Sequence, residues 1–158
     1  MLDKLIKYFV YATKGNITKT QLIKFLYLAD LYSVKWTSKQ LTELDWYYYN
    51  FGPWHEDIDA ALCRMNGKEI AIETGGNATL IKLGSQASNV EDLQLPVSLK
   101  LVLDNIRREW AGSEKLNQLL EYVYNTVPML EVKDKHKPEE KVRLNLQAER
   151  EKLISELD

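Results

Sequence analysis

Apolar side chains recur at helical spacing over residues 2–14 and again over residues 19–36. In the first segment they occupy one face and the lysines lie opposite, a pattern typical of an amphipathic helix. Gly15 ends this segment, and Thr18 is placed to cap the next one. The second segment is apolar almost all round, which predicts a central helix that packs on several sides.

One carboxylate, that of Asp30, interrupts the apolar pattern of the central helix. It falls on the same side as Tyr27 and Val34, and a buried carboxylate without partners is costly. We therefore expect Asp30 to accept hydrogen bonds from backbone amides or a tyrosine hydroxyl, or to sit at an opening. A functional acid is the weaker interpretation, because no base lies near it in the sequence.

Residues 45–51, DWYYYNF, predict an extended strand because they are aromatic and lack helix formers. Side chains alternate across a strand. This divides the aromatic side chains into two faces, with Trp46 and Tyr48 on one and Tyr47, Tyr49 and Phe51 on the other.

The next two residues, Gly52 and Pro53, predict a turn into a helix with Pro53 at its first position. Glu56 and Asp57 then fall in the first turn, where the helix dipole favours acidic side chains. An apolar stripe ending at Met65 completes this helix.

The remaining pattern adds a β-hairpin and further helices. Residues 69–74 and 78–83 flank a glycine-rich turn and predict paired strands. Residues 84–95 are expected to be a polar loop, followed by helices after Pro96 and from Ser113 to before Pro128. The predicted fold class is α+β, predominantly helical, with a helical core and a small antiparallel hairpin or sheet. We divide the chain into a domain, 1–130, and a charged C-terminal extension, 131–158, with a helix over about 139–156.

Charge is unevenly distributed along the chain, whose formal net charge is -2. Residues 1–40 hold seven lysines against two acids, and residues 41–132 hold seven basic against fourteen acidic side chains. Solvated lysines on amphipathic helices explain the basic first quarter better than a nucleic-acid surface does. An alternative function from another class is a DNA-binding regulator of its own operon, or a phage-encoded regulatory protein. DNA would then bind the surface between Lys14 and Lys24.

Aromatic side chains are concentrated more strongly than charge. The chain has 4 Trp, 9 Tyr and 3 Phe, and ten of these sixteen lie within residues 25–54. Those of the central helix are expected in the core, whereas the aromatic strand has a second face to cover or expose. Because Trp and Tyr dominate protein interfaces, the candidate partner-binding residues are Trp46, Tyr48 and Trp54.

Catalytic signals are weak throughout the sequence. His55-Glu56-Asp57 lacks the second histidine, four residues on, of a zinc-protease helix. Cys63 is expected to be a buried, inert thiol, and as the only cysteine it excludes an internal disulfide. We predict no catalytic, cofactor-binding or metal-binding residue and no enzyme, with a hydrolase that depends on His55 as the third alternative. No apolar run reaches the length of a transmembrane helix, so the expected location is the cytoplasm.

The order of motifs over residues 21–62 resembles that of the Panacea domain, the SocA-like antitoxin family of bacteria and phages. A Lys-Leu-x-Tyr-x-Ala-Asp-like helix precedes a Leu-Thr step, an aromatic strand and a Gly-Pro turn. Departures are Phe25 for Leu, Phe51 for Tyr and Gln40 for Pro, which broadly keep size and polarity. The positions that match the motif and are carried over as family-motif residues are Lys24, Leu26, Tyr27, Ala29, Asp30, Leu41, Thr42, Gly52 and Pro53.

This resemblance covers most of residues 2–130 and implies a mostly helical α+β domain. It also implies a protein-binding role, in which the chain neutralises a cognate protein toxin by direct contact. Some relatives are thought to act as adaptors that present the toxin to a protease, which would be a second partner. We expect no cofactor and no membrane contact, and nucleic-acid binding stays an open alternative that the sequence does not support.

Overall fold

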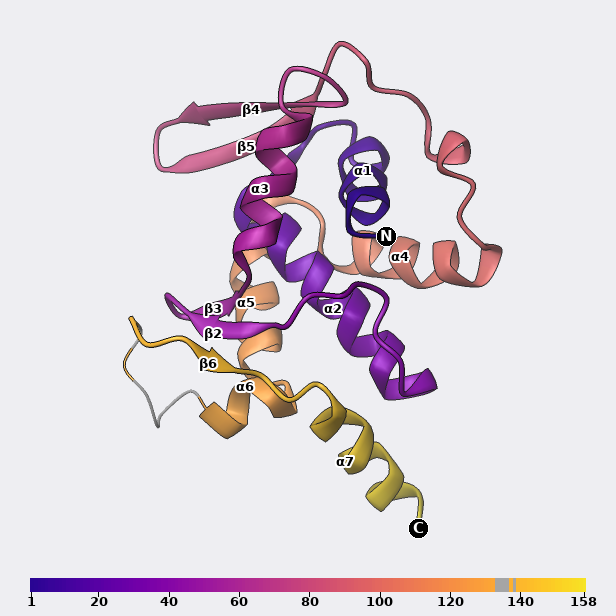
Figure 1. Ribbon diagram of the computed structural model, residues 1–158, viewed down its shortest axis with the longest axis vertical. Coiled ribbons are helices and arrows are strands. Elements are labelled where there is room, and N and C mark those ends of the chain that lie inside the picture. The colour runs from indigo at the N-terminus through magenta and orange to yellow at the C-terminus, as the bar shows by residue number, and fades with distance from the viewer. Residues whose placement is uncertain (133–136, 138) are drawn as a thin grey trace.

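The computed structural model describes residues 1–132, 137 and 139–158. Its short strands are interspersed among the helices along the chain (Figure 1). In chain order they are α1 (Leu2–Ala12), β1 (Ile17–Thr18), α2 (Lys19–Thr37), β2 (Tyr47–Tyr49), β3 (Gly52–Trp54), α3 (Glu56–Met65), β4 (Ile70–Gly75), β5 (Ala78–Leu83), the 3-10 turn η1 (Val90–Leu93), α4 (Val97–Trp110), η2 (Ser113–Lys115), α5 (Leu116–Tyr124), α6 (Val127–Val132), β6 (Val142–Arg143) and α7 (Gln147–Leu157).

Helix α2 is the centre of the fold, as its all-round apolar pattern predicts. A reciprocal pair of hydrogen bonds between Thr18 and Gln21 caps its N-terminus. Helices α1, α4, α5 and α7 all pack against it (Figure 1). From Phe25 to Leu31 every residue is buried, and Asp30 is among them.

Two small antiparallel sheets flank this helical core within the described residues. Strands β4 and β5 form the expected hairpin, which β1 extends in the order β1-β5-β4. The second sheet has the order β3-β2-β6, and its β6 strand comes from the C-terminal segment. The predominantly helical α+β class predicted from the sequence is therefore confirmed.

The segment after the aromatic strand differs from the prediction. Asn50 and Phe51 adopt left-handed backbone angles, with φ of 50° and 68°, and form a two-residue hairpin turn. The chain therefore reverses, and Pro53 lies in β3 opposite Tyr48. Helix α3 begins at Glu56, three residues later than expected, because the hairpin extends through Trp54.

The segment 84–95 is also more ordered than a plain polar loop. It contains η1, and two of its apolar side chains, Leu93 and Leu95, are buried in the core at 8% exposure each. Periodicity cannot detect such isolated anchors, because neither helix nor strand spacing links them.

The C-terminal segment packs against the body of the protein. Strand β6 pairs with β2, and α7 packs against α2 and α6 at one end of the molecule (Figure 1). The predicted helix over about 139–156 is observed at Gln147–Leu157, and residues 133–136 and 138 lie outside the described residues. Within the described part of the chain, no helix combines the length and apolarity needed to cross a membrane.

Candidate functional site: an aromatic hairpin joined to the central helix

The carboxylate of Asp30 is fully buried and joins α2 to the segment that leads into the hairpin. The backbone amides of Leu41 and Thr42 donate to Oδ1 at 3.0 and 2.9 Å. The Thr42 hydroxyl and the Trp46 indole N–H donate to Oδ2 at 2.5 and 2.8 Å. The expectation of backbone-amide donors agrees with this arrangement, and an indole takes the place of the expected tyrosine hydroxyl.

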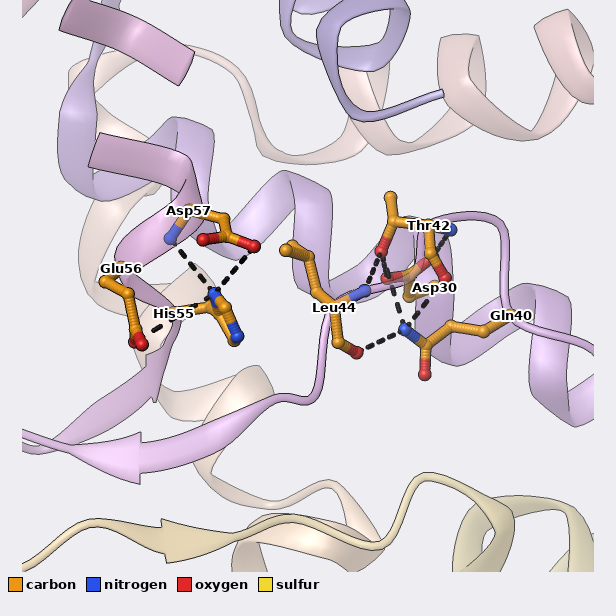
Figure 2. Close-up of polar contacts among 7 residues, drawn as sticks. All are labelled: Asp30, Gln40, Thr42, Leu44, His55, Glu56 and Asp57. Atoms are coloured by element: carbon orange, nitrogen blue, oxygen red, sulfur yellow. Dashed lines mark hydrogen bonds and ion pairs between the residues drawn. The ribbon is translucent and has the colours of Figure 1, made fainter. Parts of the chain in front are cut away.

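The loop clamped by Asp30 is braced from within. The side-chain amide of Gln40 donates to the carbonyl oxygens of Thr42 and Leu44, and the Leu44 amide donates to the Thr42 hydroxyl (Figure 2). These hydrogen bonds from the Gln40 side chain hold the loop in one conformation. This network fixes the direction in which the chain enters β2.

Burial and hydrogen bonding act on the Asp30 carboxyl in opposite directions. Burial raises its pKa, and the hydrogen bonds from Thr42, Trp46 and the Leu41 amide lower it. Burial is the larger effect, so the pKa lies above its usual value. A buried acceptor with four converging donors is what a structural clamp requires.

The inner face of the hairpin belongs to the core. Trp46 is 1% and Tyr48 is 4% exposed. Trp46 packs edge-on against Tyr27, whose hydroxyl bonds Thr126 at 2.8 Å. A residue that contacts a partner must be exposed, and Trp46 and Tyr48 are not. The Trp46 indole bonds Asp30, and the Tyr48 side chain points inward. Of the three candidate partner-binding residues only Trp54 reaches the surface.

The outer face of the hairpin presents partly exposed aromatic side chains. Tyr47 and Trp54 are directly opposite each other in the β2–β3 register, and the rings of Tyr49 and Trp54 lie 5.0 Å apart. The ammonium of Lys141 lies 4.8 Å from the centre of the Trp54 ring and 5.6 Å from that of Tyr49. We call Tyr47, Tyr49 and Trp54 the aromatic face.

Lys24, the motif lysine of α2, lies beneath the turn of this hairpin. A Cβ atom placed on Gly52 would come within 2.8 Å of its Nζ. Within the described residues no ion pair joins Lys24 to Asp30, and burial lowers the pKa of its ammonium to about 8. Gly52, the first residue of β3, is thus a place of close approach, where the missing side chain leaves room for the lysine.

His55 serves as the N-cap of α3. Its Nδ1 accepts the backbone N–H of Asp57 at 3.0 Å, beside the carboxylates of Glu56 and Asp57 (Figure 2). The arrangement needs Nδ1 unprotonated, so this nitrogen is committed to capping rather than to a reaction. Cys63 is exposed, contrary to the expected burial, because it lies on α3 opposite the stripe of Ile58 and Leu62. Among the described residues no cluster of His, Cys, Asp or Glu is arranged to hold a metal ion.

Helices α2 and α4 border an apolar groove that the sequence analysis missed. Its volume is about 440 Å³, and Trp36 at its edge is 64% exposed although its helical register suggested the core. The signal in the sequence was that Trp36 falls in the last turn of α2. The lining comprises Ala29, Tyr32, Ser33, Trp36, Thr37, Leu41, Ser98, Leu99, Val102 and Asn105.

Four of the seven lysines of the basic first quarter make separate contacts. Lys7 pairs with Glu69, and Lys19 pairs with Asp59. Lys35 lies over the Trp36 ring at 5.7 Å, and Lys24 is recessed under the hairpin. These contacts spread the positive charge over several surfaces and give no argument for a nucleic-acid interface.

Comparison with protein families places these features in context. The family model of the antitoxin SocA-like, Panacea domain matches residues 22–156. No curated protein and no solved structure matches the chain. The matched region includes the Asp30 clamp, the aromatic hairpin and all but the last two residues of the C-terminal segment. The chain therefore belongs to the SocA-like antitoxin family.

Proposed function

We propose that this protein is a non-enzymatic, cytoplasmic antitoxin that neutralises a cognate protein toxin by direct contact. Family membership supports an antitoxin-like role and suggests a non-catalytic one. The capping role of His55 is consistent with a binding function.

The toxin contacts the aromatic face of the hairpin in this proposal. The observation that carries it is the adjacency of three partly exposed aromatic side chains, Tyr47, Tyr49 and Trp54, on a hairpin whose entry is clamped by Asp30. Rigid aromatic side chains provide large contact area at low entropic cost, and Trp and Tyr are the residues that most often dominate interface energies. Phe51, 61% exposed at the hairpin tip, extends the same surface.

Co-expression with the products of neighbouring genes tests this function. We expect one product to arrest growth, this protein to relieve the arrest, and the two purified proteins to co-elute in size-exclusion chromatography. Trp54→Ala should weaken the complex at least tenfold, whereas Trp36→Ala, a tryptophan in the distant part of α2, should not. Loss of binding only with Trp36→Ala would instead place the contact at the α2–α4 groove. If no neighbouring product is toxic, or if a toxin is not relieved, the proposed function is refuted.

The protease-adaptor route gives a different result in the same experiment. Direct neutralisation leaves the amount of toxin unchanged and inhibits it with purified components alone. An adaptor lowers the amount of toxin in cells, needs the protease, and fails in the purified system. Neutralisation that depends on a protease would therefore contradict direct contact.

A further inference from the structure

A short basic segment of the chain covers one edge of the aromatic hairpin. Residues 141–146, which we call the strap, contain β6 and cross β2 in antiparallel register, with Val142 opposite Tyr48 and Arg143 opposite Tyr47. Figure 1 shows β6 following the edge of β2 before the chain enters α7. The Leu144 amide donates to the Trp46 carbonyl oxygen at 2.8 Å and completes the contact.

Side chains of the strap alternate between the outer face of the hairpin and the core. Lys141 lies over the rings of Tyr49 and Trp54, and the Arg143 guanidinium bonds the Asp45 carboxylate at 2.6 Å. Val142, between them, is partly buried and packs against the core. A basic–apolar–basic sequence in an extended conformation is therefore the ligand that this edge accepts within its own chain.

The polar contacts in the N-terminal half of the strap are weak, whereas Leu144 and Leu146 are buried in the core and anchor its C-terminal end. Only two residue pairs join β6 to β2, and the side chains of Arg143 and Asp45 are 68% and 55% exposed. Exposed ion pairs contribute little because water and salt screen them. An open pocket of about 470 Å³ lies between the strap and the residues beneath it, which include Val34, Leu44 and Trp46.

The surroundings of the aromatic face favour a basic ligand. Asp45 lies at one end of β2, and Glu56 and Asp57 follow β3 with their carboxylates exposed, at 60% and 66%. The ring of His55, between β3 and these acids, lies 6.0 Å from that of Tyr47. Aromatic rings beside carboxylates attract Lys and Arg through both ring quadrupole and charge.

We propose that an extended basic segment of the protein partner, with Lys or Arg at positions two residues apart, binds to the edge of β2 in place of residues 141–143 of the strap. The inference rests on the proposed function for the existence of the partner and names the chemistry of its contact. Backbone hydrogen bonds to β2 supply affinity in this mode, and alternate side chains supply specificity. The strap competes with the partner. The apparent affinity is therefore the intrinsic affinity multiplied by the fraction of molecules whose strap is displaced.

A fluorescent peptide with the sequence of residues 139–146, EEKVRLNL, probes the site on the full chain. We expect weak binding to the wild-type protein and at least fivefold tighter binding to Lys141→Ala/Arg143→Ala, whose own strap is weakened. The matched variant Lys68→Ala/Lys152→Ala, which removes two exposed lysines elsewhere, should bind as the wild type does. Adding Trp54→Ala to the strap variant should weaken binding at least tenfold, and a peptide with Glu at both basic positions should not bind.

Equal binding to all variants, no binding to any, or equal binding of the charge-reversed peptide would overturn the inference. Circular dichroism of each variant shows whether it is folded. A concentration-dependent dimer, in which one copy's strap lies on another copy, would replace the partner with a second chain and would also overturn it. The peptide assay needs no toxin, so its failure leaves toxin neutralisation standing. If a toxin is found and Asp45→Lys does not weaken its binding, the inference fails while the proposed function holds.

Discussion

The indole N–H of Trp46 donates to the carboxylate of Asp30 at 2.8 Å, across sixteen positions of the chain. This bond joins the central helix to the start of the aromatic hairpin and explains why both ends of the contact are buried. A tryptophan that satisfies a buried carboxylate is not free to contact a partner. The bond therefore divides the hairpin into an inner, structural face and an outer face that can bind.

Replacing Asp30 by Asn should destabilise the protein by about 2–4 kcal/mol, because an amide NH₂ would face donors that now bond a carboxylate oxygen. Urea unfolding measures this loss. Asp45→Asn is the matched control, since its exposed ion pair with Arg143 should cost less than about 1 kcal/mol. Equal losses in the two variants would contradict the clamp.

Replacing Lys24 by Met should stabilise the protein at pH 7, because the folded state holds a recessed ammonium whose pKa burial lowers from 10.5 to about 8. We expect a gain of about 1–2 kcal/mol after discounting for solvent access. As pH rises from 8 to 10.5, the folded protein releases the proton before the unfolded chain does. Wild-type stability therefore rises relative to that of the variant, and the gain shrinks.

Unfolding free energies at pH 7 and pH 10 test this sign. Lys39→Met, at an exposed position after α2, is the control and should show the same difference at both pH values. A gain for Lys24→Met that does not change with pH would mean that the ammonium is not penalised by burial.

The sequence was sufficient for the parts of the fold that depend on local pattern. The all-round apolar character of α2 and the need to satisfy Asp30 followed from neighbouring residues, and both agree with the structure. The strap could not be predicted in this way, because Arg143 and Asp45 are 98 residues apart and β6 has only two residues. The burial of Trp46 depended on its partner in another element. The hairpin turn was missed because Phe51 has a left-handed backbone, whereas such turns usually have glycine at this position.

Replacing Gly52 by Ala should cost about 1 kcal/mol, because the new methyl group must displace the Lys24 ammonium. In a Lys24→Ala background the cost should fall by about 0.5–1 kcal/mol, and this coupling is the measured quantity in a double-mutant cycle. Gly75→Ala, where nothing lies within 4 Å of the added atom, should show no coupling to Lys24. A cycle without coupling at Gly52 would place the strain elsewhere.

Replacing His55 by Ala should cost about 1 kcal/mol of stability, because the Asp57 amide at the N-terminus of α3 loses its acceptor. Asn caps helices well, so His55→Asn should recover most of that loss. The two variants distinguish a capping role from a reactive one. If His55 only caps, the Asn variant should relieve toxin-induced growth arrest to the same extent as the wild type. An Asn variant that is stable yet fails to neutralise would show that the imidazole acts beyond the cap, through contact with the partner beside Tyr47 or through a reaction.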